Sequence, residues 1–290
     1  MTLWREYKQP ASLVEAIHDL SSAPGPVMPI AGGTDLMLDL QQGRHAPVHT
    51  LVDLNAIPEM NALEIREKEL FVGATVPLSR IAFSHLVQEH ARVLAEACQL
   101  VGGPQVRNMA TLGGNVAHAL PAADGTIALM VLDTRVELAS LEGKRRVLLS
   151  DLFLGPGQSA LKVGQELLVG FYIPCVAPQQ ASAFRRIMRA QGIALPILNL
   201  AVWLERKFSR ISDVRIAVGP SGPTPQRIVA AEDNLRGQPL TAEVCNNALE
   251  VLLQQVHFRT SPHRASAEYR QHLVASLLMD TLETAWQRAK

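Results

Sequence analysis

The chain has 290 residues, of which 48% are hydrophobic and 19% charged, so it can bury sizeable cores and form about two domains. Basic and acidic side chains number 27 each, and this formal net charge of zero excludes the basic surface field expected of a nucleic-acid-binding protein. Three scattered cysteines without a CxxC pair exclude an iron–sulfur or zinc site built from cysteines of this chain, and they suit a reducing compartment.

The first 173 residues alternate between helix-like and strand-like patterns. Ser12 and Glu15 form a capping box that opens the first helix, and Pro77 suits the first turn of a later one. The predicted helices cover residues 12–23, 34–43, 77–90, 91–102 and 125–134. The predicted strands and hairpins cover residues 27–31, 49–54, 63–76, 135–150 with Gly143 in the turn, and an extended run ending at 173.

The pattern changes after residues 174–180, which form the best candidate linker. Three strand-like runs at 182–189, 195–205 and 213–220 precede two amphipathic helices at 241–256 and 266–289. Strands followed by helices are typical of an α+β unit. The N-terminus lacks the apolar core of a secretory signal and no run approaches 18 apolar residues, so we expect a cytoplasmic chain without a membrane span.

Two Gly-Gly pairs stand about 80 residues apart, in "IAGGTDLMLDL" (30–40) and "MATLGGNVAHALPAAD" (109–124). Glycine lets the backbone adopt positive φ and lets another molecule approach closely. Each pair is interpreted as a turn, the first between a strand and a helix, where backbone N–H groups could hold the two halves of a diphosphate. Neither stretch matches GxGxxG or the P-loop, and each could be only a turn.

The remaining polar clusters do not form a catalytic or metal-binding arrangement. His118 and Asp124 lack the spacing of a metal motif, and His85 and His90 are expected to face solvent. "GKRR" (143–146) is typical of a solvated edge strand, and Ser266 of a helix cap. The sequence therefore favours binding of a cofactor that carries its own chemistry.

Four stretches, spread nearly end to end, resemble one known family: "IAGGTDLM", "GGPQVRNMATLGGNVAHALPAAD", "GPGQSALKVGQELLVGFYIP" and "RASAEYRQHLVASLL". The chain resembles the flavin-binding medium subunit of the molybdenum hydroxylases, the xanthine dehydrogenase and carbon monoxide dehydrogenase family. The resemblance implies an α+β fold: a vanillyl-alcohol-oxidase-type FAD domain at 1–176, with two α/β subdomains at about 1–57 and 58–176. A small α+β domain with a three-stranded sheet is then expected at 181–290.

The resemblance also implies which residues bind FAD. The segments expected to grip its diphosphate and ribityl chain are Pro29, Ile30, Ala31, Gly32, Gly33, Thr34, Asp35, Leu36, Thr111, Leu112, Gly113, Gly114 and Asn115. Asp124 would accept hydrogen bonds from the cofactor, and Leu168 would line the flavin pocket. Arg185 stands where many relatives have lysine. Relatives often carry an acidic residue where this chain has Gln191 and Gly192, which leaves Ile193 nearest the isoalloxazine ring.

The implied function is electron transfer. Electrons would come from a large molybdopterin subunit through two [2Fe–2S] clusters on a small subunit, reach FAD on this chain, and leave to NAD⁺, oxygen or another acceptor. Two alternatives stay open: a flavin-free scaffold or assembly subunit, and a self-contained flavin reductase. The reductase needs its own proton donor beside the flavin, and no obvious Ser and Glu pair is present.

Overall fold

The computed structural model describes residues 2–189, 195–262 and 264–290. Its N-terminal part is a parallel three-stranded sheet in the order β1-β3-β2, formed by β1 (Glu6–Lys8), β2 (Val27–Ile30) and β3 (Thr50–Asp53). Helices α1 (Leu13–Ser22) and α2 (Leu36–Gln41) connect these strands. The capping box of α1 is confirmed, because Ser12 accepts a hydrogen bond from the Glu15 N–H and the Glu15 carboxylate accepts one from the Ala11 N–H.

The second layer is an antiparallel five-stranded sheet in the order β4-β5-β10-β6-β7. It consists of β4 (Leu63–Arg66), β5 (Glu69–Gly73), β6 (Arg135–Ser140), β7 (Gly143–Leu148) and β10 (Leu167–Pro174). The small hairpin β8 (Phe153–Gly155) and β9 (Gln158–Ser159) and the 3₁₀ turns η1 (Pro58–Asn61) and η2 (Leu149–Leu152) complete this region. The "GKRR" run starts the edge strand β7 and is exposed, as expected.

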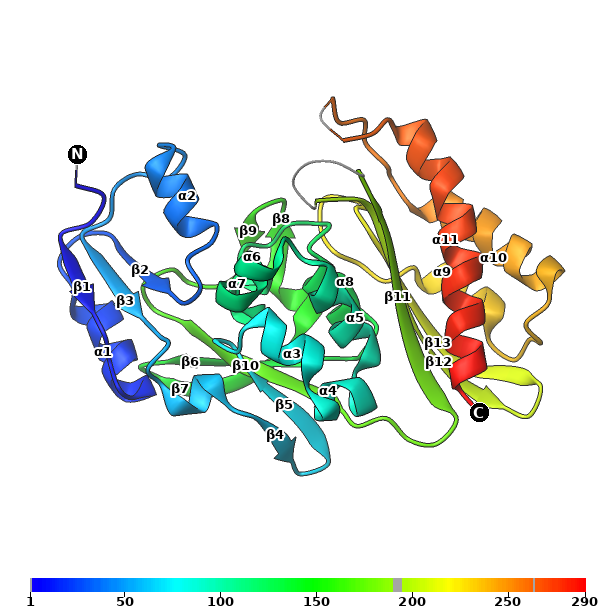
Figure 1. Cartoon of the computed structure of the whole chain (residues 1–290), viewed down its shortest axis with the longest axis horizontal. Coiled ribbons are helices and arrows are strands. Elements are labelled where there is room, and N and C mark those ends of the chain that lie inside the picture. The colour runs from blue at the N-terminus through cyan, green and yellow to red at the C-terminus, as the bar shows by residue number, and fades with distance from the viewer. Residues whose placement is uncertain (1, 190–194, 263) are drawn as a thin grey trace.

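A layer of helices lies between this sheet and the C-terminal sheet (Figure 1). It contains α3 (Leu78–Phe83), α4 (His85–His90), α5 (Arg92–Leu100), α6 (Pro104–Met109), α7 (Leu112–Ala117) and α8 (Asp124–Met130). The single helix predicted for 77–90 is wrong: Ser84 interrupts it in extended conformation and caps α4 through its hydroxyl. The sequence patterns also did not predict α6.

The C-terminal region is an antiparallel sheet β11-β12-β13 covered by helices. Its elements are β11 (Gln180–Met188), β12 (Pro196–Lys207), β13 (Arg210–Gly219), α9 (Val229–Leu235), α10 (Ala242–Gln255) and α11 (Ala267–Arg288). The three predicted strands and both long helices are confirmed, whereas α9 was not predicted. One face of the sheet packs on α10 and α11 in its own core, and Phe184, Ala201 and Trp203 face the core of the preceding region.

Candidate cofactor site

The first glycine segment is a loop that leaves β2 and enters α2. Gly33 has a φ of +65°, which favours glycine, and the loop is fixed to β3 because the side-chain amide of Asn55 donates to the Ala31 carbonyl at 3.0 Å. Within the described part of the chain, none of the six consecutive backbone N–H groups from Ala31 to Leu36 donates a hydrogen bond. These donors are available to an anionic ligand.

The fold brings the two glycine segments into direct contact. A Cβ at Gly32 would overlap the carbonyl oxygen of Met109 and lie 2.9 Å from the Cα of Ala110, the residue before Thr111. Likewise, a Cβ at Gly113 would lie 2.6 Å from the Cβ and the carbonyl oxygen of Ala74. Real Cβ atoms do not approach backbone so closely, so both glycines are required for packing.

The second segment is helical, so its interpretation as a Gly-Gly turn is wrong. Thr111 is the N-cap of α7, and its hydroxyl accepts a hydrogen bond from the Gly114 N–H at 3.2 Å. The N–H groups of Leu112 and Gly113 donate to carbonyls of Val76 and Ala74. The free backbone donors therefore belong to the first segment, while the second segment provides a close-packed wall with Gly114 exposed on it.

Asp124 begins α8, is 4% exposed, and is held by two side chains from the C-terminal sheet. Its carboxylate accepts hydrogen bonds from Arg186 Nη1 at 2.5 Å and from Asn199 Nδ2 at 2.7 Å. Burial raises the pKa of Asp124, and the nearby Arg186 guanidinium and the Asn199 amide oppose that rise. This buried ion pair joins the two halves of the molecule at the site.

Four buried polar atoms near Asp124 have no hydrogen-bond partner among the described residues: Asn115 Oδ1, Thr126 Oγ1, Asn199 Oδ1 and Arg186 Nε. Asn115 Oδ1 lies beside α8, because a Cβ at Gly125 would be 2.7 Å from it. Buried polar atoms normally have partners, so this concentration indicates a place for a polar ligand or bound water. The predicted residues Asn115 and Asp124 therefore share one polar cluster.

The structure does not bring Arg185 to this cluster. Its guanidinium donates to Asp280 and Thr284 of α11, on the opposite face of the sheet. Successive strand residues point to opposite faces, so only one of two adjacent arginines can reach Asp124, and that one is Arg186. The sequence patterns did not identify Arg186 or Asn199; the period-2 alternation of β11 was the signal that could have separated the two arginines.

Two further predicted residues have different outcomes. Leu168 is buried in β10 next to an irregularity in its pairing with β6, and the neighbouring Val169 carbonyl accepts from the Ala74 N–H that leads to the Gly113 contact. Leu168 thus lies in the core behind the second segment. Ile193, with Gln191 and Gly192, lies outside the described residues.

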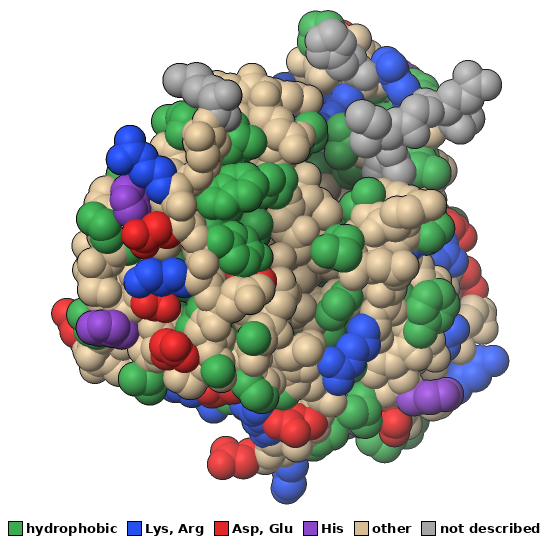
Figure 2. Space-filling model, turned by 60° about the vertical axis from the view of Figure 1, so that its left-hand side comes forward, with side chains coloured by type: hydrophobic (Ala, Val, Ile, Leu, Met, Phe, Trp, Pro, Cys, Tyr) green, Lys and Arg blue, Asp and Glu red, His purple; other side chains and the backbone are tan. Residues whose placement is uncertain are grey.

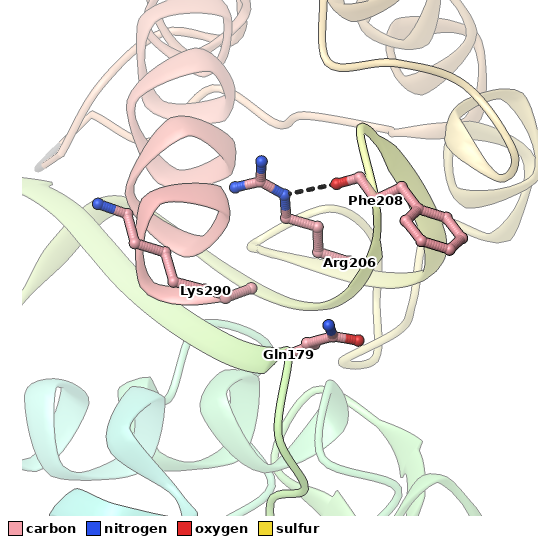
Figure 3. Close-up of a pocket in the computed structure, with 5 residues that line it drawn as sticks. Gln179, Arg206, Phe208 and Lys290 are labelled. Carbon is pink, nitrogen blue, oxygen red and sulfur yellow. Dashed lines mark hydrogen bonds between the residues drawn. The ribbon is translucent and has the colours of Figure 1, made fainter.

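The surface hollows do not coincide with the glycine segments. The hollow in Figure 3, about 400 Å³, lies at the C-terminal end of α11 and is lined by Gln179, Arg206, Phe208, Ala289 and Lys290. Figure 2 shows the face carrying the N-terminal elements, where many hydrophobic side chains reach the surface. The exposed apolar residues near the glycine segments include Leu38, Val106 and Met109.

Two searches over the described residues gave negative results. They contain no cluster of three His, Cys, Asp or Glu side chains that could hold a metal ion. None of the helices formed by those residues is both long enough and apolar enough to cross a membrane.

Comparisons with known proteins agree with this arrangement over nearly the whole chain. Residues 4–176 match the family described as "FAD binding domain in molybdopterin dehydrogenase", and residues 182–285 match "CO dehydrogenase flavoprotein C-terminal domain". The nicotine 6-hydroxylase medium subunit of Paenarthrobacter nicotinovorans is 34% identical, with 97% of each chain covered. The putative xanthine dehydrogenase FAD-binding subunit XdhB of Escherichia coli K12 is 29% identical, with 96% of this chain and 95% of the relative covered.

Solved structures lead to the same family. A chain of carbon monoxide dehydrogenase from Hydrogenophaga pseudoflava superposes with a TM-score of 0.93 at 27% identity, covering 99% of both chains. A chain of quinoline 2-oxidoreductase from Pseudomonas putida 86 superposes with a TM-score of 0.90 at 28% identity, covering 98% of both. The expected fold class is confirmed, and the chain belongs to the family of FAD-binding medium subunits of the molybdenum hydroxylases.

Proposed function

We propose that this chain binds FAD between its two glycine segments and the Asp124 cluster, and that it passes electrons from iron–sulfur clusters of a partner subunit to an acceptor. The observation that carries this proposal is the run of six unused N–H donors at residues 31–36, placed against the segment that precedes Thr111. Backbone dipoles can hold a diphosphate without lysine, which suits a chain with no net charge.

The residues present fit the cofactor. Gly32 and Gly113 fix the spacing of the two segments, Gly33 allows the loop to turn, and Gly114 leaves the wall open. The unpartnered atoms of Asn115 and Thr126 suit the hydroxyl groups of a ribityl chain. When bound, FAD supplies the chemistry of accepting and releasing electrons, and the protein supplies binding, orientation and electrostatics.

Asp124 has a defined role in this arrangement. The Arg186 guanidinium and the Asn199 amide hold its carboxylate in one orientation, so the position of any hydrogen bond that it accepts is fixed in advance. Because the two holding residues come from β11 and β12, the C-terminal region completes the site.

The metal cofactors belong to partner chains in this proposal. Cys98 and Cys245 are buried and Cys175 is half-buried, and the sequence provides no fourth cysteine for a [2Fe–2S] cluster. A small iron–sulfur subunit and a large molybdopterin subunit would therefore supply the electrons. NAD⁺ is one candidate acceptor, alongside oxygen, and the cytoplasm is the proposed compartment.

The test is an absorption spectrum of the chain purified alone and then with its co-expressed partner subunits. Flavin bands in the first preparation, joined by iron–sulfur absorbance in the second, are the expected result. Protein that is colourless in both preparations and takes up no added FAD would contradict the proposal and favour a flavin-free scaffold. A yellow chain that recruits no iron–sulfur protein would instead favour a self-contained flavin enzyme.

A further inference from the structure

Three arginines gather around the turn that leads into α11. Arg259 precedes the turn, Arg264 lies within it, and Arg270 lies in the first turns of the helix. Arg270 links the parts, because its Nε donates to the Ile197 carbonyl of β12 at 3.0 Å and its Nη1 donates to the Arg259 carbonyl. A hydrogen bond from the Arg264 N–H to the Ser261 carbonyl holds the turn. The three guanidinium groups are thus brought close together.

This cluster has no negative partner in the described part of the chain. Arg270 is 1% exposed and Arg264 is half-buried, yet neither they nor Arg259 form an ion pair. None of the seven residues outside that part is an aspartate or glutamate. Glu268, the acidic residue in the first turn of α11, is exposed and pairs with none of the three. The protein itself leaves the positive charge uncompensated.

Other buried arginines of this chain are treated differently. Arg186 has Asp124 as its partner, and Arg215 and Arg227 share Asp133. Burial lowers the pKa of Arg270 and of Arg264, and the neighbouring guanidinium groups lower both further. A buried charge without a counter-charge is costly, so an anion bound here would relieve a cost that the fold otherwise bears.

The position of the cluster relates it to the cofactor site. Figure 1 shows the N-terminal end of α11 at the same end of the sheet as the end of β11. Ile197, which Arg270 contacts, is two residues from Asn199, or about 7 Å along the strand. The N-terminus of the 22-residue helix α11 adds positive potential at this end.

We propose that Arg259, Arg264 and Arg270 form an anion site that binds the phosphate groups of a nucleotide electron acceptor. Arginine matches phosphate geometry through paired N–H donors, and a dinucleotide is long enough to place its phosphates here while its reactive ring lies near the flavin. The inference rests on the proposed function, because it assigns the acceptor side of that electron transfer.

The test uses the full-length chain loaded with FAD and isothermal titration calorimetry with inorganic phosphate at constant ionic strength. Arg264→Gln removes one charge of the cluster from a half-buried position, and it is expected to weaken phosphate binding by roughly 10- to 100-fold. Arg210→Gln is the matched control: Arg210 is exposed, donates to the Gly237 carbonyl, and forms no ion pair in the described structure. This control is expected to bind phosphate like the parent.

NAD⁺ added to the phosphate-loaded protein distinguishes the source of the phosphate. Displacement of phosphate by NAD⁺, lost in Arg264→Gln and kept in Arg210→Gln, is the expected result. Phosphate binding that NAD⁺ does not displace would overturn the assignment to a nucleotide acceptor. Equal phosphate affinity in the parent and Arg264→Gln would overturn the site itself.

Flavin absorbance, read on the same samples, separates the two proposals. A yellow protein that fails the phosphate test refutes only the anion site. A parent that binds no FAD refutes the proposed function.

Discussion

Replacing Gly32 by alanine tests whether the two glycine segments must interlock. The added methyl group would overlap the Met109 carbonyl oxygen and approach the Cα of Ala110. Neither atom belongs to a side chain that could change its rotamer, so the backbone of one segment must move. Overpacking of this kind costs about 1–3 kcal/mol. For a unit of this size we expect the unfolding temperature to fall by roughly 3–10 °C.

Gly114→Ala is the matched control, because it adds the same methyl group to the other Gly-Gly pair. Its Cβ would meet only the Thr111 hydroxyl, at 3.3 Å, and the position is exposed and helical. Alanine is favoured over glycine in a helix by about 0.5–1 kcal/mol, so we expect the FAD-free protein to keep or slightly raise its unfolding temperature.

The assay is thermal unfolding of both variants without FAD, followed by titration with FAD. Gly32→Ala should be destabilised before any cofactor is added and should also bind FAD more weakly, since moving the Met109 backbone changes the spacing of the site. Gly32→Ala that unfolds at the parental temperature and binds FAD normally would refute the packing role of this glycine.

Three further changes test other parts of the molecule. Asp124→Asn leaves Arg186 buried without its counter-charge and should destabilise the fold by about 3–5 kcal/mol, measured by chemical denaturation; a change below 1 kcal/mol would show that the pair is not buried as described. Burial acts to raise the pKa of Glu166, but hydrogen bonds from Arg145 and the Lys162 N–H hold it below its usual value. This group therefore stabilises the fold above its unfolded-state pKa and loses that contribution as pH falls through its folded-state pKa; Arg145→Gln should flatten this acidic limb of unfolding temperature against pH, and an unchanged limb would contradict the assignment. Leu94→Ala opens the central core and should cost about 2–5 kcal/mol in the same denaturation experiment, whereas a cost near zero would mean that α5 does not pack as described.

Local patterns were sufficient for much of the fold. The caps at Ser12 and Ser266, the hairpin ending at Gly143 and the amphipathic pattern of α10 and α11 each depend on neighbouring residues, so the sequence alone predicts them. Ser84 was misjudged because a serine with apolar neighbours fits a helix interior as well as a cap, and its backbone conformation decides between them.

The candidate site was predictable in part. The glycine pairs and Asp124 stood out because their residue types are unusual for buried helices and loops. Their division of labour did not: only packing shows that Gly32 and Gly113 exclude side chains, that Gly33 sets a backbone angle, and that the second segment is a helix. A glycine has the same letter in each role, and its neighbours in space determine which role it plays.

The sequence by itself determined the secondary structure of the long elements, the absence of a cysteine-built metal site, and the family through its motifs. Tertiary structure alone decided which side chains meet across long separations. Arg186 and Asn199 reach Asp124 from 62 and 75 residues away, while Arg185 turns to α11. Strand alternation allows either adjacent arginine to face the site, and the register of the packed sheet selects one.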